Sequence, residues 1–298
     1  MRIEWTGKIA DDFYVLGHSA VPIFLLDGPA PLLVDAGFTG LSQMYERKIK
    51  NILGPRSPAF LFLTHSHWDH VGAAFHLKQV WPEMKIVGSP KSSQILTRPR
   101  AIAQIKKLNQ GALEVLRSWG ISDFCEDEFK PFDCDVVLKH DRTIKIDQDL
   151  TLEAIPAPGH TWDGTAYWIR EKKILIAGEA AGCDGVCEFL VDHEAYLNSL
   201  ATLAELDAQI LCTAHNLVLT GPDVRTYMTR SINQVPEYVN RVQRYLREEE
   251  GDVDHVVVRI KTVEWDKMPL PKQPMEAYLM STKARVETVK THMQKSFS

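Results

Sequence analysis

Four side chains of metal-binding types lie within six residues of one another, in the segment Thr64–His70 (THSHWDH). They are His65, His67, Asp69 and His70. Neutral imidazoles and carboxylates are ligands that zinc or iron takes in catalytic sites, and this segment has no thiolate of the kind that closes a structural zinc site. In a tight loop, His65 and His67 can point one way while Asp69 and His70 turn towards a neighbouring point. The segment therefore predicts a catalytic centre with two divalent cations.

Three further residues of ligand type recur downstream, each close behind an apolar run. His160 lies in the run APGHT, Glu179 follows Gly178, and His215 follows Ala214. Taken alone, such a histidine is an ordinary hydrogen-bonding residue and such a glutamate an ordinary cap, and THSHWDH alone could be a His-rich surface loop. Their recurrence at predicted strand ends favours one metal centre at one sheet edge, where ligands commonly bind.

Strands must position these side chains. Ala59–Thr64 (AFLFLT) is almost wholly apolar, which indicates a buried central strand that leads directly into His65. The runs that precede the three later residues are Leu150–Ile155, Ile174–Ala177 and Gln209–Thr213. Other strand-like runs are Phe13–Gly17, Ile23–Leu26, Leu32–Asp35, Lys85–Gly88, Val136–Leu138, Thr143–Ile146 and Ala166–Arg170.

Helical spacing marks the remaining long segments. They are Leu41–Leu53, Val71–Trp81, Ala101–Trp119, Glu194–Leu206, Asp223–Glu250 and Met275–Gln294. The ambiguous run His255–Ile260 is assigned to a helix by its context. We expect Pro236 to break or kink the helix around it, because proline removes a hydrogen-bond donor from a helix interior.

Composition limits the classes of protein. The chain has 298 residues, 45% of them hydrophobic and 24% charged, as globular proteins do. A net charge of −5 lacks the basic excess of a dedicated nucleic-acid binder, so we expect no nucleic-acid partner. Five widely spaced cysteines argue against a disulfide framework. Because Met1–Ala10 has no apolar signal core and no apolar run has the length of a membrane span, we expect a cytoplasmic protein with no membrane partner.

The order HSHWDH, PGHT, a Gly–acid pair and a strand-end histidine resembles the metallo-β-lactamase superfamily. It is more similar to the glyoxalase II-like hydrolase branch than to the antibiotic-hydrolysing enzymes, and 194–200 also resembles a quinolone-signal-response group. The resemblance spans Asp11–Gly221 and implies an α/β fold, a four-layer αββα sandwich with the metals at one edge. Residues 1–221 would form this domain with a helical insert at about 90–120, and 222–298 a C-terminal helical region.

The resemblance also assigns the ligands. The first metal would be held by His65, His67 and His160, and the second by Asp69, His70 and His215. Glu179 replaces the acid that bridges the metals, which in the family is usually an aspartate one methylene shorter, and Asp184 is a nearby acid that could compensate. We expect two divalent ions, zinc first, with iron or manganese as alternatives.

The implied activity is metal-dependent hydrolysis of an ester, thioester or lactone, in which hydroxide bound by two metals attacks and Asp69 is the catalytic residue that orients it. Tyr167 and Tyr196 are candidate general acids, but their strand and helix patterning favours structural roles. The alternatives are a phosphodiesterase, a signalling effector that retains the metal-binding fold, and a mononuclear iron enzyme that oxidises sulfur.

Two segments could recognise a small-molecule substrate. Met84–Leu113 contains six basic residues and no acidic one, which could hold an anionic tail, although a solvated surface helix has the same pattern. The helices after Pro222 have apolar faces that could wall a tunnel for an apolar tail, pack on the domain or form a homodimer contact.

Overall fold

Two seven-stranded sheets form the centre of the protein. The computed structural model describes residues 1–3, 5–138, 143–183, 186–268 and 275–295. The first sheet contains, in spatial order, β1 (Arg2–Ile3), β14 (Val218–Thr220), β13 (Ile210–Thr213), β12 (Ile174–Gly178), β11 (Thr165–Ile169), β10 (Thr151–Pro156) and β9 (Thr143–Lys145). The second contains β2 (Gly7–Ala10), β3 (Phe13–His18), β4 (Val21–Leu26), β5 (Leu32–Val34), β6 (Phe60–Phe62), β7 (Lys85–Gly88) and β8 (Val136–Val137).

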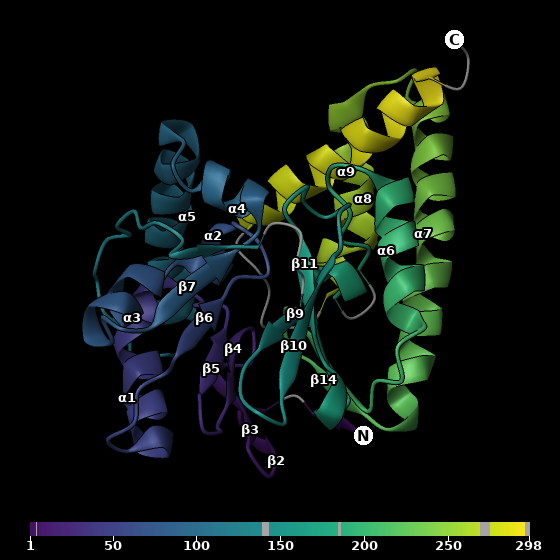
Figure 1. The fold of residues 1–298 in the computed structure, drawn as a ribbon. Helices are drawn as coiled ribbons and strands as arrows, with labels where there is room; N and C mark the ends of the chain where they lie inside the picture. Colours follow the sequence, from purple (N-terminus) through teal and green to yellow (C-terminus); the bar gives the residue numbers. More distant parts are fainter. Residues whose placement is uncertain (4, 139–142, 184–185, 269–274, 296–298) are drawn as a thin grey trace.

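Helices cover the outer face of each sheet (Figure 1). Those beside the second sheet are α1 (Ser42–Leu53), α2 (Trp68–Val71), α3 (Ala74–Val80), α4 (Pro90–Ile95) and α5 (Pro99–Ser118). Those beside the first sheet are α6 (His193–Ala204), α7 (Pro222–Glu248), α8 (Val253–Val263) and α9 (Met275–Lys295). This arrangement confirms the predicted αββα sandwich with added C-terminal helices.

Three apolar clusters hold the layers together. One lies between the sheets and includes the fully buried Phe62 and Tyr167. The other two join each sheet to its helices, around Leu33 and Tyr45 on one side and around Leu200 and Val242 on the other. A strand covered on both faces must be apolar throughout, and β4 (VPIFLL) is buried at every position.

The secondary structure differs from the sequence prediction in two respects. The expected break at Pro236 is absent, because α7 runs without interruption from Pro222 to Glu248. Packing of its buried stripe, which includes Val235, Tyr238 and Val242, compensates for the donor that proline lacks. Strands β1, β2 and β14 were missed, because strands of two to four residues are too short to show a period. Within the described ranges, no helix is long and apolar enough to span a bilayer.

Candidate active site

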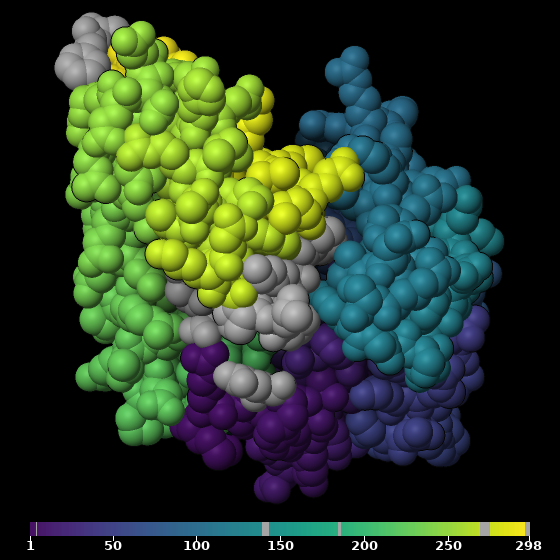
Figure 2. Space-filling view, turned by 180° about the vertical axis from the view of Figure 1, so that it is seen from behind, coloured from purple at the N-terminus to yellow at the C-terminus, as the bar shows by residue number. Residues whose placement is uncertain are grey.

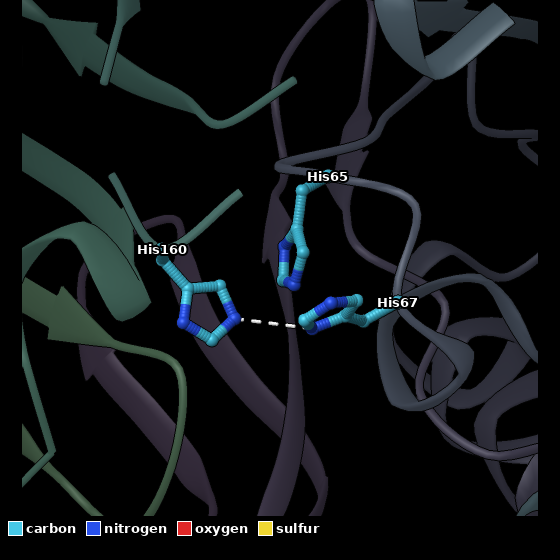
Figure 3. A group of neighbouring side chains, drawn as sticks. All are labelled: His65, His67 and His160. Carbon is cyan, nitrogen blue, oxygen red and sulfur yellow. Dashed lines mark hydrogen bonds between the residues drawn. The ribbon is translucent and has the colours of Figure 1, made fainter. Parts of the chain in front are cut away.

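The seven residues with predicted ligand roles lie together at one edge of the sandwich, in two adjacent groups. His65, His67 and His160 form the first group (Figure 3). The second group consists of Asp69, His70, Glu179 and His215. In each group, one potential ligand atom per residue lies within 4.8 Å of the others. Both groups combine side chains from the two sheets.

Local structure explains why neighbouring residues join different groups. His65 follows the buried strand β6, and His67 caps the start of α2, whose first turn contains Asp69 and His70. Because the chain turns into a helix at Trp68, the residues on either side of it point to different places. The predicted division of this segment between two groups is therefore what the structure contains.

The other three candidate ligands follow strands of the first sheet. His160 follows β10, and Glu179 and His215 follow β12 and β13, which run parallel and so end at the same edge. Gly159 has a φ of 126°, and a Cβ there would lie 2.3 Å from the Cα of Tyr196. Only glycine therefore lets this loop approach α6 closely enough to present His160.

Asp35 orients His70. Its Oδ2 lies 2.7 Å from His70 Nδ1, and its carboxylate also accepts hydrogen bonds from the backbone N–H and the hydroxyl of Thr64. A carboxylate that accepts from Nδ1 keeps the proton on that nitrogen and leaves Nε2 free to bind a cation. Asp35 itself has a φ of 62°, a conformation that aspartate tolerates better than most residues.

Backbone carbonyls orient two more histidines in the same way. His215 Nδ1 donates to Ala20 O at 2.7 Å, and His160 Nδ1 donates to Glu188 O. Because a carbonyl oxygen only accepts, both rings must carry their proton on Nδ1. In the neutral form of each ring, Nε2 has the lone pair that can bind a cation. His160 Nε2 faces His67 Nδ1 at 3.0 Å.

Glu179 reaches both groups. Its Oε1 lies 2.9 Å from His70 Nε2 and 3.3 Å from His215 Nε2 in the second group. Its Oε2 lies 3.7 Å from His65 Nδ1 in the first group. The longer side chain of glutamate therefore still directs one oxygen to each side.

Two buried atoms of this cluster, Glu179 Oε2 and His65 Nε2, have no hydrogen-bond partner among the described residues. A buried polar atom without a partner costs about 1–3 kcal/mol, so native proteins rarely leave one without a ligand. An imidazole nitrogen and a carboxylate oxygen are also donors that divalent transition metals accept. The residues present thus fit a pair of cations.

Charges in the cluster also suit cations. Burial lowers the pKa of His65 well below its ordinary value and that of His160 to about 4, so both rings are neutral at pH 7. Burial works against the charge of His70 too, but the carboxylates of Glu179 and Asp35 outweigh it and raise the pKa of His70. A divalent cation would take the place of that proton among the carboxylates.

A cavity of about 860 Å³ opens from the cluster. Five of the ligand-type residues line it, namely His67, Asp69, His160, Glu179 and His215. The candidate acids do not: Tyr167 donates its hydroxyl to Leu63 O, and Tyr196 donates to Glu179 O. Both tyrosines have structural roles.

Sequence reasoning missed several residues around the cluster. Asp35 ends the predicted strand Leu32–Asp35, so the strand-end argument used for the ligands could have found it. Asp163, which is buried and accepts a hydrogen bond from Ser66 N at 2.8 Å, gave no separate signal. Glu188 gave no separate signal either, because it contacts His160 through its backbone carbonyl. Burial raises the pKa of its carboxyl to about 7. Asp184, the predicted compensating acid, lies outside the described residues.

Curated relatives match the chain at low identity. A β-lactamase-like protein 2 homolog from Caenorhabditis elegans is 24% identical over 259 residues, which cover 83% of this chain and 72% of that protein. A hydroxyacylglutathione hydrolase from Bartonella tribocorum is 27% identical over 158 residues, which cover 52% of this chain and 47% of that protein.

Solved structures share the fold. A metallo-β-lactamase family protein from Thermus thermophilus superposes with a TM-score of 0.64 at 16% identity, covering 96% of this chain and 95% of that one. An archaeal superfamily protein from Sulfolobus tokodaii gives a TM-score of 0.58 at 15% identity, covering 95% and 100%. The family model of the metallo-beta-lactamase superfamily matches residues 17–215, which include both groups of ligand-type residues. The chain belongs to the metallo-β-lactamase superfamily.

Proposed function

We propose that this protein is a metal-dependent hydrolase that cleaves an ester, thioester or lactone at a centre of two divalent cations. The observation that carries the proposal is the pair of adjacent donor groups, with one Glu179 oxygen directed to each. Zinc is the expected metal, with iron or manganese as alternatives. The relative from Bartonella is named for hydrolysis of hydroxyacylglutathione, which supports the thioester option.

Each residue has an assigned role. One cation would be held by His65, His67 and His160, the other by Asp69, His70 and His215, and both by Glu179. Two divalent cations bound there supply a water of lowered pKa and an electrophilic contact for the substrate oxygen. Asp35 keeps His70 in its binding tautomer.

Asp69 is the proposed catalytic residue. It is half-buried and faces the cavity, with its Oδ2 3.4 Å from His215 Nε2. There its carboxylate accepts a hydrogen bond from the attacking water and orients it towards the acyl carbon. The water oxygen forms a bond to that carbon, the bond to the alcohol or thiol breaks, and the water's proton leaves with the alcohol or thiol.

Metal analysis combined with a substrate panel tests the proposal. The purified protein should contain two equivalents of metal and hydrolyse one class among thioesters, esters and lactones. His65→Ala and Asp69→Ala should lower kcat/KM at least 100-fold while circular dichroism stays unchanged. His255→Ala, at an exposed histidine outside the cluster, is the matched control and should keep metal and activity.

Three results would count against the proposal. Full activity in either ligand variant would remove the assigned centre. Cleavage of bis(p-nitrophenyl) phosphate without cleavage of carboxylic esters or thioesters would make the protein a phosphodiesterase. Absence of any turnover in metal-loaded protein would favour a signalling effector.

A further inference from the structure

We infer that the substrate's acyl group is an extended apolar chain that lies in the cavity between α5 and α9. This inference rests on the proposed function, since it concerns the substrate of the same site. It gives the cavity one occupant, the hydrocarbon part of an acyl ester or thioester.

Two helices line the cavity with matching stripes. From α5 the lining residues are Ala101, Gln104, Ile105 and Leu108, and from α9 they are Ala277, Met280, Ser281 and Ala284. Both sets follow the spacing i, i+3, i+4 and i+7, so each is one continuous face of a helix. Two helices separated by most of the chain therefore present one face each to the same cavity.

The two helices touch beside the cavity. Gln104 Nε2 lies 3.7 Å from Met280 Sδ, and Lys107 forms an ion pair with Glu276 at 2.6 Å. Figure 2 shows the yellow surface of the C-terminal segment meeting the blue surface of the segment that contains α4 and α5. These contacts bring the two helices together beside the cavity, and we call the space between α5 and α9 the channel.

The side chains of the two stripes leave room inside the channel. Alanine and serine occupy four of the eight positions, at Ala101, Ala277, Ser281 and Ala284. A methionine that is 46% exposed, Met280, is a flexible apolar side chain that adapts to different chain lengths. The volume of about 860 Å³ lies near the upper end of the range for small-molecule sites and exceeds what an acetyl group needs.

Aromatic rings form the part of the channel next to the metal ligands. Phe38 and Trp68 stack with their centroids 4.8 Å apart, and both line the cavity beside His67 and Asp69. Trp119 and Trp162 line it farther out. These rings give an apolar surface that begins at the reacting carbon.

The lining contains few basic side chains that could hold an anionic tail. The acidic side chains that line the cavity are Asp69, Asp163, Glu179 and Glu188, whereas Arg2 is the one lysine or arginine among the described lining residues. None of the six basic residues of Met84–Leu113 lines it. Lys106 pairs with Glu128 and Lys107 with Glu276 on the outer surface. A phosphate or carboxylate tail would therefore find Arg2 as its one lysine or arginine partner among the described lining residues, whereas a hydrocarbon tail needs no charged partner.

A chain-length series tests the inference. The zinc-loaded protein is assayed with acetyl, butyryl, octanoyl and decanoyl esters of p-nitrophenol and the matching thioesters of N-acetylcysteamine. Each buried methylene should raise kcat/KM about 4-fold until the channel is full. Ala284→Phe fills the channel and should lower the decanoyl-to-acetyl ratio of kcat/KM more than tenfold. Glu287→Phe, which adds the same ring at an exposed position on α9, should leave the ratio unchanged.

A second pair of variants avoids any effect on folding. Met280 is exposed at the channel wall, so Met280→Lys should fold normally. It should lower the decanoyl-to-acetyl ratio of kcat/KM, whereas Met280→Leu, which keeps the wall apolar, should not. Binding is measured separately with 2-decanone and 2-butanone, ketones that the enzyme cannot hydrolyse. Trp68, Trp119 and Trp162 line the cavity, so tryptophan fluorescence should change with 2-decanone at far lower concentrations than with 2-butanone.

The two proposals fail separately. Hydrolysis that does not depend on chain length, or that favours acetyl esters, overturns the inference and leaves the hydrolase standing. Binding of 2-decanone that Ala284→Phe or Met280→Lys weakens, without hydrolysis of any ester or thioester, supports the apolar channel and overturns the proposed function. Absence of both hydrolysis and 2-decanone binding overturns both.

Discussion

Asp35 supports the candidate centre without being one of its predicted ligands. Its carboxylate accepts hydrogen bonds from Thr64 and His70, so one residue fixes the start of the HSHWDH loop and the orientation of a ligand. The candidate ligands could be predicted because the segments that contain them come shortly after strands. Among the residues that orient them, Asp35 could have been found at the end of its predicted strand. Glu188 and Ala20 could not, because they act through backbone carbonyls, and every residue has a carbonyl.

Asp35→Asn should lower metal affinity at the second group about 10- to 100-fold, because an amide can donate to Nδ1 and favour the wrong tautomer of His70. Metal content after dialysis against increasing chelator concentrations measures this. Glu46→Gln alters a similar contact, 2.7 Å from His76 Nε2 but outside the cluster, and is the control. Equal metal retention in both variants would contradict the role of Asp35.

Among the elements, α9 has two roles. It lines the cavity with one face, and with another it fixes the loop that positions His160. Arg285 is 1% exposed and donates to Cys187 O at 2.7 Å, while Thr288 donates to Leu190 O at 2.6 Å. Glu188 lies between Cys187 and Leu190 in the sequence, and its backbone carbonyl accepts a hydrogen bond from His160 Nδ1. The apolar period predicted that α9 is a helix, but its contact with this loop depends on tertiary packing that no period encodes.

Arg285→Ala should lower the free energy of unfolding by about 1–3 kcal/mol, because it leaves the buried Cys187 carbonyl without its donor, while Glu264 keeps Arg241 and Tyr278 as donors. Urea denaturation measures the loss. Arg285→Lys, which keeps the charge, should lose less. If the alanine variant is as stable as the wild type, the buried guanidinium does not anchor α9.

Pro236→Ala should raise the free energy of unfolding by about 2 kcal/mol, because alanine restores a helix donor at an exposed position inside α7. Thermal and urea unfolding measure the gain. Asn233→Ala, at an exposed position one turn earlier, is the control for helix propensity alone and should raise stability by at most about 0.7 kcal/mol. An unchanged or lower stability of the proline variant would mean that α7 needs the proline.

For the whole molecule, the candidate centre joins the two sheets. His65, His67, Asp69 and His70 follow a strand of the second sheet, and His160, Glu179 and His215 follow strands of the first. The order of strands within each sheet could not be read from the sequence, since β1 pairs with β14 across almost the whole domain. The layered architecture was expected only because the motifs resemble a family.

Removal of the metal should therefore destabilise the whole fold. A ligand bound to the native state at about 1,000 times its Kd adds about 4 kcal/mol, which corresponds to a shift of roughly 10 °C in a domain of this size. Differential scanning calorimetry before and after chelation measures the change, and added zinc should restore the Tm. An unchanged Tm with complete loss of metal would show that the layers do not depend on the centre.

The pairing of β1 with β14 also determines when the first sheet can be completed. Arg2 lies opposite Leu219 and Ile3 opposite Val218. The edge of the first sheet can therefore form only after a segment some two hundred residues later has been synthesised. The cluster around His65 likewise cannot form before Glu179 and His215 have been synthesised. Contacts of such long range form slowly and late. During synthesis, the segment THSHWDH is made before Glu179 and His215 exist, so the two donor groups can be completed only after residue 215 has been added.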